Sequence, residues 1–120
     1  RRQRQMCIRD RYEYDALDDY PDFIFPCAKA VADDEESRGI ILGGSGQGEA
    51  MAANRIKGCR ATVFYSGPKE IITLSREHNN ANILCLGARV TESAIINNIV
   101  NTFINTAFDG GRHIKRLEKF

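Results

Sequence analysis

The sequence predicts an α/β domain built on a parallel β-sheet. Three short runs of apolar and β-branched residues, at positions 40–42, 59–65 and 83–86, are typical of strands, and each is followed by a segment that favours a helix. Strands that alternate with helices pair in parallel through right-handed crossovers. With 120 residues, of which 42% are hydrophobic and 28% charged, the chain has the size and composition of one such domain.

Helices are expected on both sides of the first strand. Asp19-Tyr20-Pro21 is typical of a turn into a helix, but Pro26 is expected to interrupt that helix, so the firmer helix runs from Pro26 to Asp33. After the strand, Glu49 and the alanines behind it favour a second helix, which Lys57-Gly58 is expected to end as a C-cap.

The second half of the chain is expected to continue this alternation. Residues 69–75 favour a short helix, residues 76–82 a polar loop, and the strand at 83–86 ends at Gly87. Thr91 is the expected N-cap of the longest helix, which has one apolar face. That face consists of Ile95, Ile96, Ile99, Val100, Phe103 and Ile104. It carries more apolar side chains than one sheet surface needs, which is compatible with a subunit interface.

A glycine-rich loop directly follows the first strand. Residues 43–49 read Gly-Gly-Ser-Gly-Gln-Gly-Glu and are expected to open into a helix. The free N–H groups and the positive dipole end of such a helix favour a phosphate or a developing oxyanion. The spacing lacks the Gly-Lys-Ser/Thr of a Walker loop and only half fits the dinucleotide fingerprint. A tight strand-to-helix turn without a ligand is therefore an alternative.

Composition and spacing argue against several classes of protein. No apolar run approaches the roughly 20 residues of a membrane span and no signal peptide is visible, so a cytoplasmic location without a membrane partner is expected. The four cysteines lack zinc-ligand spacing among themselves and with the two histidines, so we expect buried, reduced thiols and no metal. The net charge is +1, but residues 1–11 carry five arginines and one aspartate. The rest of the chain is net negative, which argues against nucleic-acid binding.

Residues 1–11 show neither helical nor strand periodicity and are expected to be disordered. Residues 6–11, Met-Cys-Ile-Arg-Asp-Arg, also resemble the translation of a sequencing adapter, so we expect this leader to be foreign to the natural protein. A basic arm that binds RNA is the alternative.

Further polar residues are candidates for a binding site. Because parallel strands end at the same edge of a sheet, residues 43–49, 66–68 and 88–89 should share one rim. Near the C-terminus, Arg112 and Arg116 are four residues apart, and on a helix they could clamp one phosphate. A basic helix that faces water is the alternative for this pair.

Four blocks of sequence resemble, in order, the type B ribose-5-phosphate isomerase family, which also contains the galactose-6-phosphate isomerase subunits. They are residues 39–54 around the glycine loop, 75–82 (Ser-Arg-Glu-His-Asn-Asn-Ala-Asn), 86–90 (Leu-Gly-Ala-Arg-Val) and 108–113 (Phe-Asp-Gly-Gly-Arg-His). The resemblance covers about residues 14–119. It implies a three-layer αβα sandwich with a Rossmann-like parallel sheet. It also implies a cofactor-free isomerase that interconverts ribose 5-phosphate and ribulose 5-phosphate through an ene-diolate.

The resemblance also implies roles for individual residues. Many family members carry a cysteine base where this chain has Gly43, but another branch reads Gly-Gly-Ser-Gly-x-Gly-Glu and uses the glutamate, which makes Glu49 the expected base. A first-turn acid that complements the helix dipole is the alternative for Glu49. His78, otherwise a solvated loop histidine, is expected to assist ring opening. The resemblance assigns the ene-diolate to Ser45, Gly44, Gly46 and Gly48, a sugar hydroxyl to Asn79, and the phosphate to Arg89, Arg112 and Arg116.

One departure from the family concerns the start of the chain. Family members begin with a strand that ends in Asp-His and is followed by a helix, and nothing before Tyr14 matches this unit. We therefore expect residues 12–120 to be an isomerase domain without its first strand and helix, with a vacant central place in the sheet and little or no activity by itself.

The resemblance further implies a site shared between two subunits, hence a homodimer or tetramer that binds a phosphorylated sugar. Two rival functions stay open. One is a subunit of a galactose-6-phosphate isomerase. The other is a non-catalytic phosphate- or nucleotide-binding module, which would need neither Glu49 nor His78.

Overall fold

The structure is a computed structural model that describes residues 6–7, 19–87 and 91–120. Its centre is a parallel sheet of four strands in the order β1-β2-β4-β3. The strands are β1 (Met6–Cys7), β2 (Arg38–Gly43), β3 (Ala61–Phe64) and β4 (Ile83–Gly87). Strands β2 and β4 pair from Gly39 with Ile83 to Gly43 with Gly87, so both end at the same edge.

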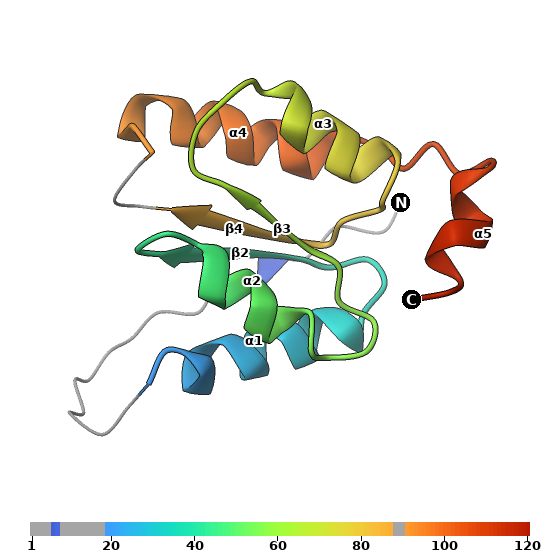
Figure 1. Ribbon diagram of the computed structural model, residues 1–120, viewed down its shortest axis with the longest axis horizontal. Coiled ribbons are helices and arrows are strands. Elements are labelled where there is room, and N and C mark those ends of the chain that lie inside the picture. The colour runs from blue at the N-terminus through green and yellow to red at the C-terminus, as the bar shows by residue number, and fades with distance from the viewer. Residues whose placement is uncertain (1–5, 8–18, 88–90) are drawn as a thin grey trace.

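Helices cover both faces of the sheet (Figure 1). Helices α1 (Pro21–Ala32) and α2 (Gln47–Ala53) pack on one face, and α3 (Glu70–Glu77) and α4 (Ser93–Asn105) on the other. Helix α5 (His113–Leu117) lies beyond one end of the sheet. The predicted three-layer αβα sandwich is confirmed. Among the described residues, no helix is long and apolar enough to cross a bilayer.

Strand β4 connects the two cores that these layers form. Ile83 and Cys85 face α1 and α2, whereas Leu84 and Leu86 face α3 and α4, and all four are 0% exposed. A strand buried on both faces reads as a continuous apolar run, which is why its prediction from sequence is confirmed.

Helix α1 runs through Pro26, so the predicted start at Pro26 is wrong. Ile24, Cys27, Ala28 and Val31 recur at helical spacing, and all four are buried against the sheet. A proline inside a helix costs about 3 kcal/mol. Burial of several apolar side chains, at about 1.5–3 kcal/mol for each large one, offsets this cost.

Two predicted helix ends are also wrong. Helix α2 stops at Ala53 rather than at Lys57-Gly58, because the Asn54 side chain bonds to β3: its Nδ2 donates to the Ala61 carbonyl at 3.2 Å, and its Oδ1 accepts from the Ala61 N–H at 2.7 Å. Helix α4 has Glu92 as its N-cap. Thr91, the predicted cap, instead donates its hydroxyl to the Tyr65 carbonyl at 3.0 Å.

The expectations for the leader are corrected at two residues. Met6–Cys7 forms β1, in parallel register with Arg38 and Gly39 of β2, so disorder is wrong for these two residues. The unpaired backbone groups of a strand edge provide the partner that such a short segment needs. The four strands are hydrogen-bonded without a gap, so the vacant central place is not found among the described residues. Residues 1–5 and 8–18 lie outside the part of the chain that the structure describes.

Buried arginines tie α4 to the amino edge of the sheet, the edge at which β2 and β4 begin. Arg76 was expected in a polar loop, but it belongs to α3 and is 3% exposed. Its guanidinium donates to the carbonyls of Thr106 and Ala81 at 2.9 and 2.5 Å. Arg38 donates to the carbonyl of Phe103, and both guanidinium groups lie 6.0 Å from the centre of the Phe103 ring. Arg76 is therefore a structural residue rather than part of a solvated loop.

Replacing Arg76 by methionine removes the charged donor for two backbone carbonyls but keeps much of the side-chain volume. Hydrogen bonds to charged groups contribute about 1.5–3 kcal/mol, so we expect the free energy of unfolding to fall by roughly 3 kcal/mol. Urea denaturation followed by circular dichroism measures this change. Arg55→Met, at an exposed arginine, should change the free energy by less than about 0.5 kcal/mol. Equal losses in the two variants would contradict the role given to Arg76.

Candidate functional site

The glycine loop lies at the carboxyl edge of the sheet, where β2 and β4 end. Gly46 is the N-cap of α2 and has a φ of 79°, in the left-handed region that favours glycine. A Cβ on Gly46 would lie 3.3 Å from the Cys85 carbonyl oxygen and from the Gly87 nitrogen. The loop is therefore seated directly on the end of β4. The prediction that it opens straight into a helix is confirmed.

The residues that follow the three strands meet at this edge. A Cβ on Gly87 would lie 2.7 Å from the Ser45 carbonyl oxygen and 2.8 Å from the Tyr65 Cβ. The glycine loop after β2 and Tyr65, the residue that precedes the predicted segment 66–68, therefore meet at this edge of the sheet. Arg89, predicted to bind the phosphate, lies outside the described part of the chain, as do its neighbours in residues 88–90.

Glu49 lies in the first turn of α2 and turns its carboxylate back toward the end of β2. A Cβ on Gly43 would lie 2.5 and 2.6 Å from the two carboxylate oxygens of Glu49. The side chain is half-buried, and among the described residues its oxygens accept no hydrogen bond. The loop thus presents a carboxylate at its inner side, in the place expected for a base. The same position also complements the dipole of α2.

The nearest thiol does not compete with this carboxylate as a base. Cys85 is fully buried on β4, and burial together with the negative charge of Glu49 raises its pKa to about 12. It therefore stays protonated at neutral pH. Cys27 and Cys59 are also buried thiols. The expectation of buried, reduced thiols is confirmed for the three cysteines whose side chains the structure describes.

Two hydroxyl groups border the loop. The Ser45 Oγ accepts a hydrogen bond from the Gln47 N–H at 3.2 Å, which leaves its own proton available. Tyr20, at the N-terminus of α1, places its hydroxyl 2.5 Å from where a Cβ on Gly48 would lie, and it is 52% exposed. From the sequence, Tyr20 was expected only as part of a turn. Its position beside the loop depends on the packing of α1 and had no signal in the local sequence.

A second group of predicted residues gathers around α5 and is called here the His-Arg cluster: His78, His113, Arg112 and Arg116. His78 caps the C-terminus of α3, and its ring stacks on that of His113 with centroids 4.3 Å apart and an angle of 19°. The Arg116 Nη1 lies 3.5 Å from the His113 Nδ1. Burial, followed by the nearby His78, Arg112 and Arg116, lowers the pKa of His113, against a smaller opposing effect of Asp109.

The His-Arg cluster can bind an anion. Arg112 and Arg116 are exposed, and guanidinium groups suit phosphate oxygens. Arg116 lies in α5, whereas Arg112 is its N-cap with helical dihedral angles, so the predicted placement of both on one helix is correct only for Arg116. Asn79 follows His78 and is exposed, beside a cavity of about 490 Å³.

The glycine loop and the His-Arg cluster lie at opposite edges of the sheet (Figure 1). Gly43 is the last paired residue of β2, whereas His78 precedes Asn82, whose carbonyl accepts from the Gly39 N–H at the beginning of β2. With about 3.3 Å for each residue, the strand separates the two edges by roughly 13 Å. One copy of the chain therefore does not bring Glu49 together with Arg112 and Arg116.

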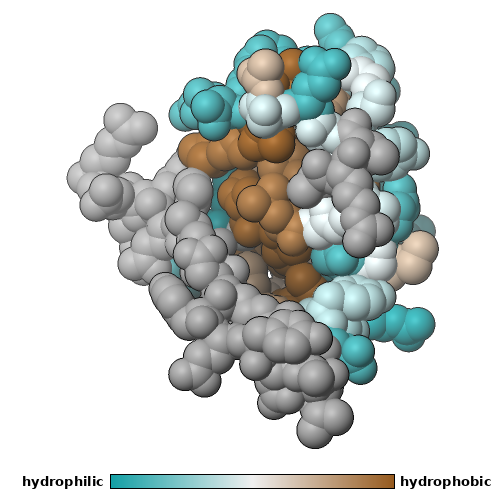
Figure 2. Space-filling view, turned by 90° about the vertical axis from the view of Figure 1, so that its left-hand side faces the viewer, coloured by the Kyte–Doolittle hydropathy of each residue, from teal (hydrophilic) through white to brown (hydrophobic). Residues whose placement is uncertain are grey.

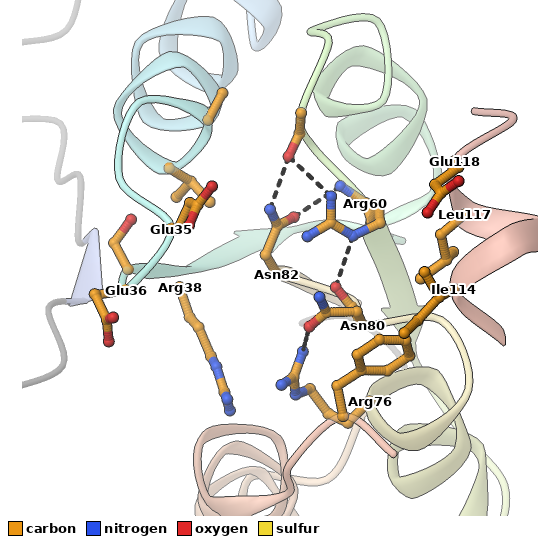
Figure 3. A pocket seen from close by; sticks show the side chains of 15 residues that line it. Glu35, Glu36, Arg38, Arg60, Arg76, Asn80, Asn82, Ile114, Leu117 and Glu118 are labelled. Carbon is orange, nitrogen blue, oxygen red and sulfur yellow. Dashed lines mark hydrogen bonds between the residues drawn. The ribbon is translucent and has the colours of Figure 1, made fainter. Parts of the chain in front are cut away.

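A third feature is a cavity of about 600 Å³ at the amino edge of the sheet (Figure 3). Arg60 donates to the Asn80 carbonyl at 2.8 Å, and Asn82 donates to the Gly58 carbonyl at 2.9 Å. Two of the polar side chains that line this cavity are thus bound to backbone carbonyls, and the predicted site residues do not line it. Within the described residues, no three His, Cys, Asp or Glu side chains are grouped to hold a metal ion.

The fold and the two polar groups define the class: an α/β protein with a carboxylate in a glycine loop at the strand ends and a cationic cluster suited to phosphate. The sequence model of a family described as Ribose/Galactose Isomerase matches residues 3–120. The chain belongs to this family. The resemblance drawn from the four sequence blocks is confirmed.

Individual relatives agree with this assignment. The chain is 44% identical over 108 residues to the probable ribose-5-phosphate isomerase B of Mycoplasma genitalium, a match that covers 88% of this chain and 69% of that protein. It is 41% identical to ribose-5-phosphate isomerase B of Mycolicibacterium paratuberculosis, over 89% of this chain and 67% of that protein. The crystal structure of the M. genitalium enzyme with bound ribulose-5-phosphate superposes with a TM-score of 0.83 at 40% identity, covering 92% of this chain and 72% of that one.

Acidification should destabilise the fold through His113, because its pKa in the folded chain lies below the ordinary value. As the pH falls through about 6.5, the unfolded chain binds more protons than the folded chain, so the free energy of unfolding decreases; well above this pH the effect vanishes. We expect the urea midpoint to fall between about pH 7.5 and about pH 5.5, and to fall less steeply in His113→Gln. Identical slopes in parent and variant would show that His113 does not contribute.

Proposed function

We propose that this protein is an aldose-ketose isomerase that interconverts ribose 5-phosphate and ribulose 5-phosphate without a cofactor. The observation that carries the proposal is the Glu49 carboxylate, held at the end of β2 inside the glycine loop. The chain that carries this carboxylate belongs to the ribose/galactose isomerase family. The M. genitalium relative has been seen with bound ribulose-5-phosphate, which supports the pentose phosphate as ligand.

The reaction needs a base that carries a proton between two neighbouring carbons. In this proposal the Glu49 carboxylate removes the proton from C2 of the open-chain aldose, which gives an ene-diolate, and returns it to C1, while the hydroxyl proton of O2 passes to O1. The N–H groups of Gly44, Gly46 and Gly48 and the hydroxyl of Ser45 stabilise the negative charge that develops on the oxygens. The closeness of the carboxylate to the loop supports this division of roles.

The far end of the substrate requires the other group of residues. His78 assists ring opening, Asn79 holds a sugar hydroxyl, and Arg112 and Arg116, together with Arg89, bind the phosphate. In the sugar phosphate, C2 and the phosphorus atom are joined by five bonds of about 1.5 Å each, less than the roughly 13 Å between the two edges of the sheet. A complete site therefore combines the loop of one copy with the His-Arg cluster of a second copy, and a homodimer is the smallest active unit.

The surface supports such an assembly. Figure 2 shows the end of the molecule at which β2 and β4 finish, and hydrophobic side chains gather in its middle. Leu42, near the end of β2, is 63% exposed, and Ile95 on α4 is 37% exposed. Along the predicted apolar face of α4, only Ile99 and Phe103 are buried. Large apolar side chains left open on a helix are typical of surfaces that bind another subunit.

Glu49→Gln tests the base, because the amide keeps the size of the side chain but cannot accept the proton. We expect the exchange of substrate hydrogen with D₂O, followed by NMR, to slow by at least about 100-fold. Ribulose 5-phosphate binding, measured by calorimetry, should persist. The control is Glu36→Gln, at an exposed glutamate of the other edge. Unchanged exchange in Glu49→Gln would exclude the base role, and exchange with galactose 6-phosphate alone would favour the hexose isomerase.

Complementation tests the shared site. Glu49→Gln chains and chains with Arg112→Gln and Arg116→Gln should each be inactive. When the two kinds of chain are mixed in equal amounts, about half of the dimers contain one chain of each kind. Each of these mixed dimers has one intact site of its two, so about one quarter of the parent exchange rate should return.

The control mixture pairs Glu49→Gln with a chain that carries all three substitutions, and it should stay inactive. Failure to recover activity while native mass spectrometry shows mixed dimers would contradict a site built from two copies.

A further inference from the structure

Gly43 ends β2, and its backbone does not require glycine. The glycines with φ in the left-handed region are Gly46, Gly58, Gly67, Gly110 and Gly111, and Gly43 is not one of them. It pairs in regular parallel register with Gly87. An L-residue can therefore adopt the backbone conformation of Gly43, so glycine at this position has to be explained by space.

The space next to Gly43 is filled by the carboxylate of Glu49. A Cβ at Gly43 would lie within 2.6 Å of both carboxylate oxygens, closer than real Cβ atoms approach any neighbour. The group that would have to move is the far end of a flexible side chain. At Gly87, by contrast, a Cβ would meet the backbone carbonyl of Ser45 at 2.7 Å. A side chain at Gly43 would thus displace Glu49 and leave the backbone in place, whereas one at Gly87 would disturb the loop itself.

We propose that Gly43 is a positioning residue. Because Gly43 has no side chain, it leaves a space at the end of β2, called here the seat, that holds the Glu49 carboxylate against the strand. Any side chain at Gly43 competes with Glu49 for that seat. This inference rests on the proposed function for its catalytic consequence. The position of the Glu49 carboxylate next to Gly43 does not depend on that function and can be tested separately.

Gly43→Ala tests the consequence. Because the methyl group displaces a flexible side chain, the urea midpoint should stay within error of the parent. The carboxylate moves away from the reacting carbons, and a displacement of about 1 Å can cost about 100-fold in rate. We expect the rate of hydrogen exchange into the substrate to fall by at least about 10-fold, with ribulose 5-phosphate binding largely kept.

A double-variant cycle separates positioning from damage to the loop. Glu49→Asp withdraws the carboxylate by one carbon-carbon bond, about 1.5 Å, which makes room for the alanine methyl group. Adding Gly43→Ala to Glu49→Asp should therefore slow exchange by no more than about 2-fold, since two residues in contact are coupled. If Gly43→Ala caused the same loss in the parent chain and in Glu49→Asp, the proposal would be overturned, because Gly43 would then act through the backbone.

NMR tests the seat without any catalysis. In the parent chain, the amide resonance of Gly43 should shift as the Glu49 carboxyl titrates, and this shift should vanish in Glu49→Gln. In Gly43→Ala the same response should fall by more than half. No response in the parent overturns the seat. A different outcome would overturn the proposed function instead. In that outcome the Gly43 amide responds as expected, which supports the seat, but neither Gly43→Ala nor Glu49→Gln changes the rate of hydrogen exchange into the substrate.

Discussion

The parallel pairing of β2 with β4 is the constraint on which the candidate site depends. The two strands end side by side at Gly43 and Gly87, and the loop between β2 and α2 turns immediately over that end. The turn is possible because Gly46 takes a left-handed conformation and because Gly87 has no side chain to collide with the Ser45 carbonyl. Helix α2 must then start within a few residues of the strand. This short connection brings the carboxylate of its first turn back over the strand end.

The same strand register separates the Glu49 carboxylate from the His-Arg cluster. Residues that follow a strand and residues that precede it lie at opposite edges of a parallel sheet, and the His-Arg cluster precedes β4 or docks beside the segment that does. The buried arginines at the amino edge fix the end of α4 and hold this segment in place. In the proposed function, these two groups are the halves of a site that is completed by a second copy of the chain. The exposed apolar residues Leu42 and Ile95 offer surface for such a contact.

The sequence predicted those features that depend on local pattern. The apolar runs of β2 and β4 and the glycine loop were found because strands buried on both faces and helix starts have local signatures. The continuation of α1 through Pro26 was not predicted, because the local sequence shows the energetic cost of a proline in a helix. It does not show the burial of apolar side chains against the sheet, which offsets that cost. Arg76 was assigned to a loop on polarity alone, although backbone carbonyls from another segment satisfy it. Tyr20 could not be found, because its place beside Gly48 depends on how two helices pack.

A crystal structure of this protein with ribulose 5-phosphate would show directly whether two copies share the site. We expect the carbons C1 and C2 to lie against the Glu49 carboxylate of one copy while Arg112 and Arg116 of a second copy bind the phosphate. A sugar phosphate held within a single copy, or a Glu49 carboxylate turned away from C1 and C2, would contradict this expectation.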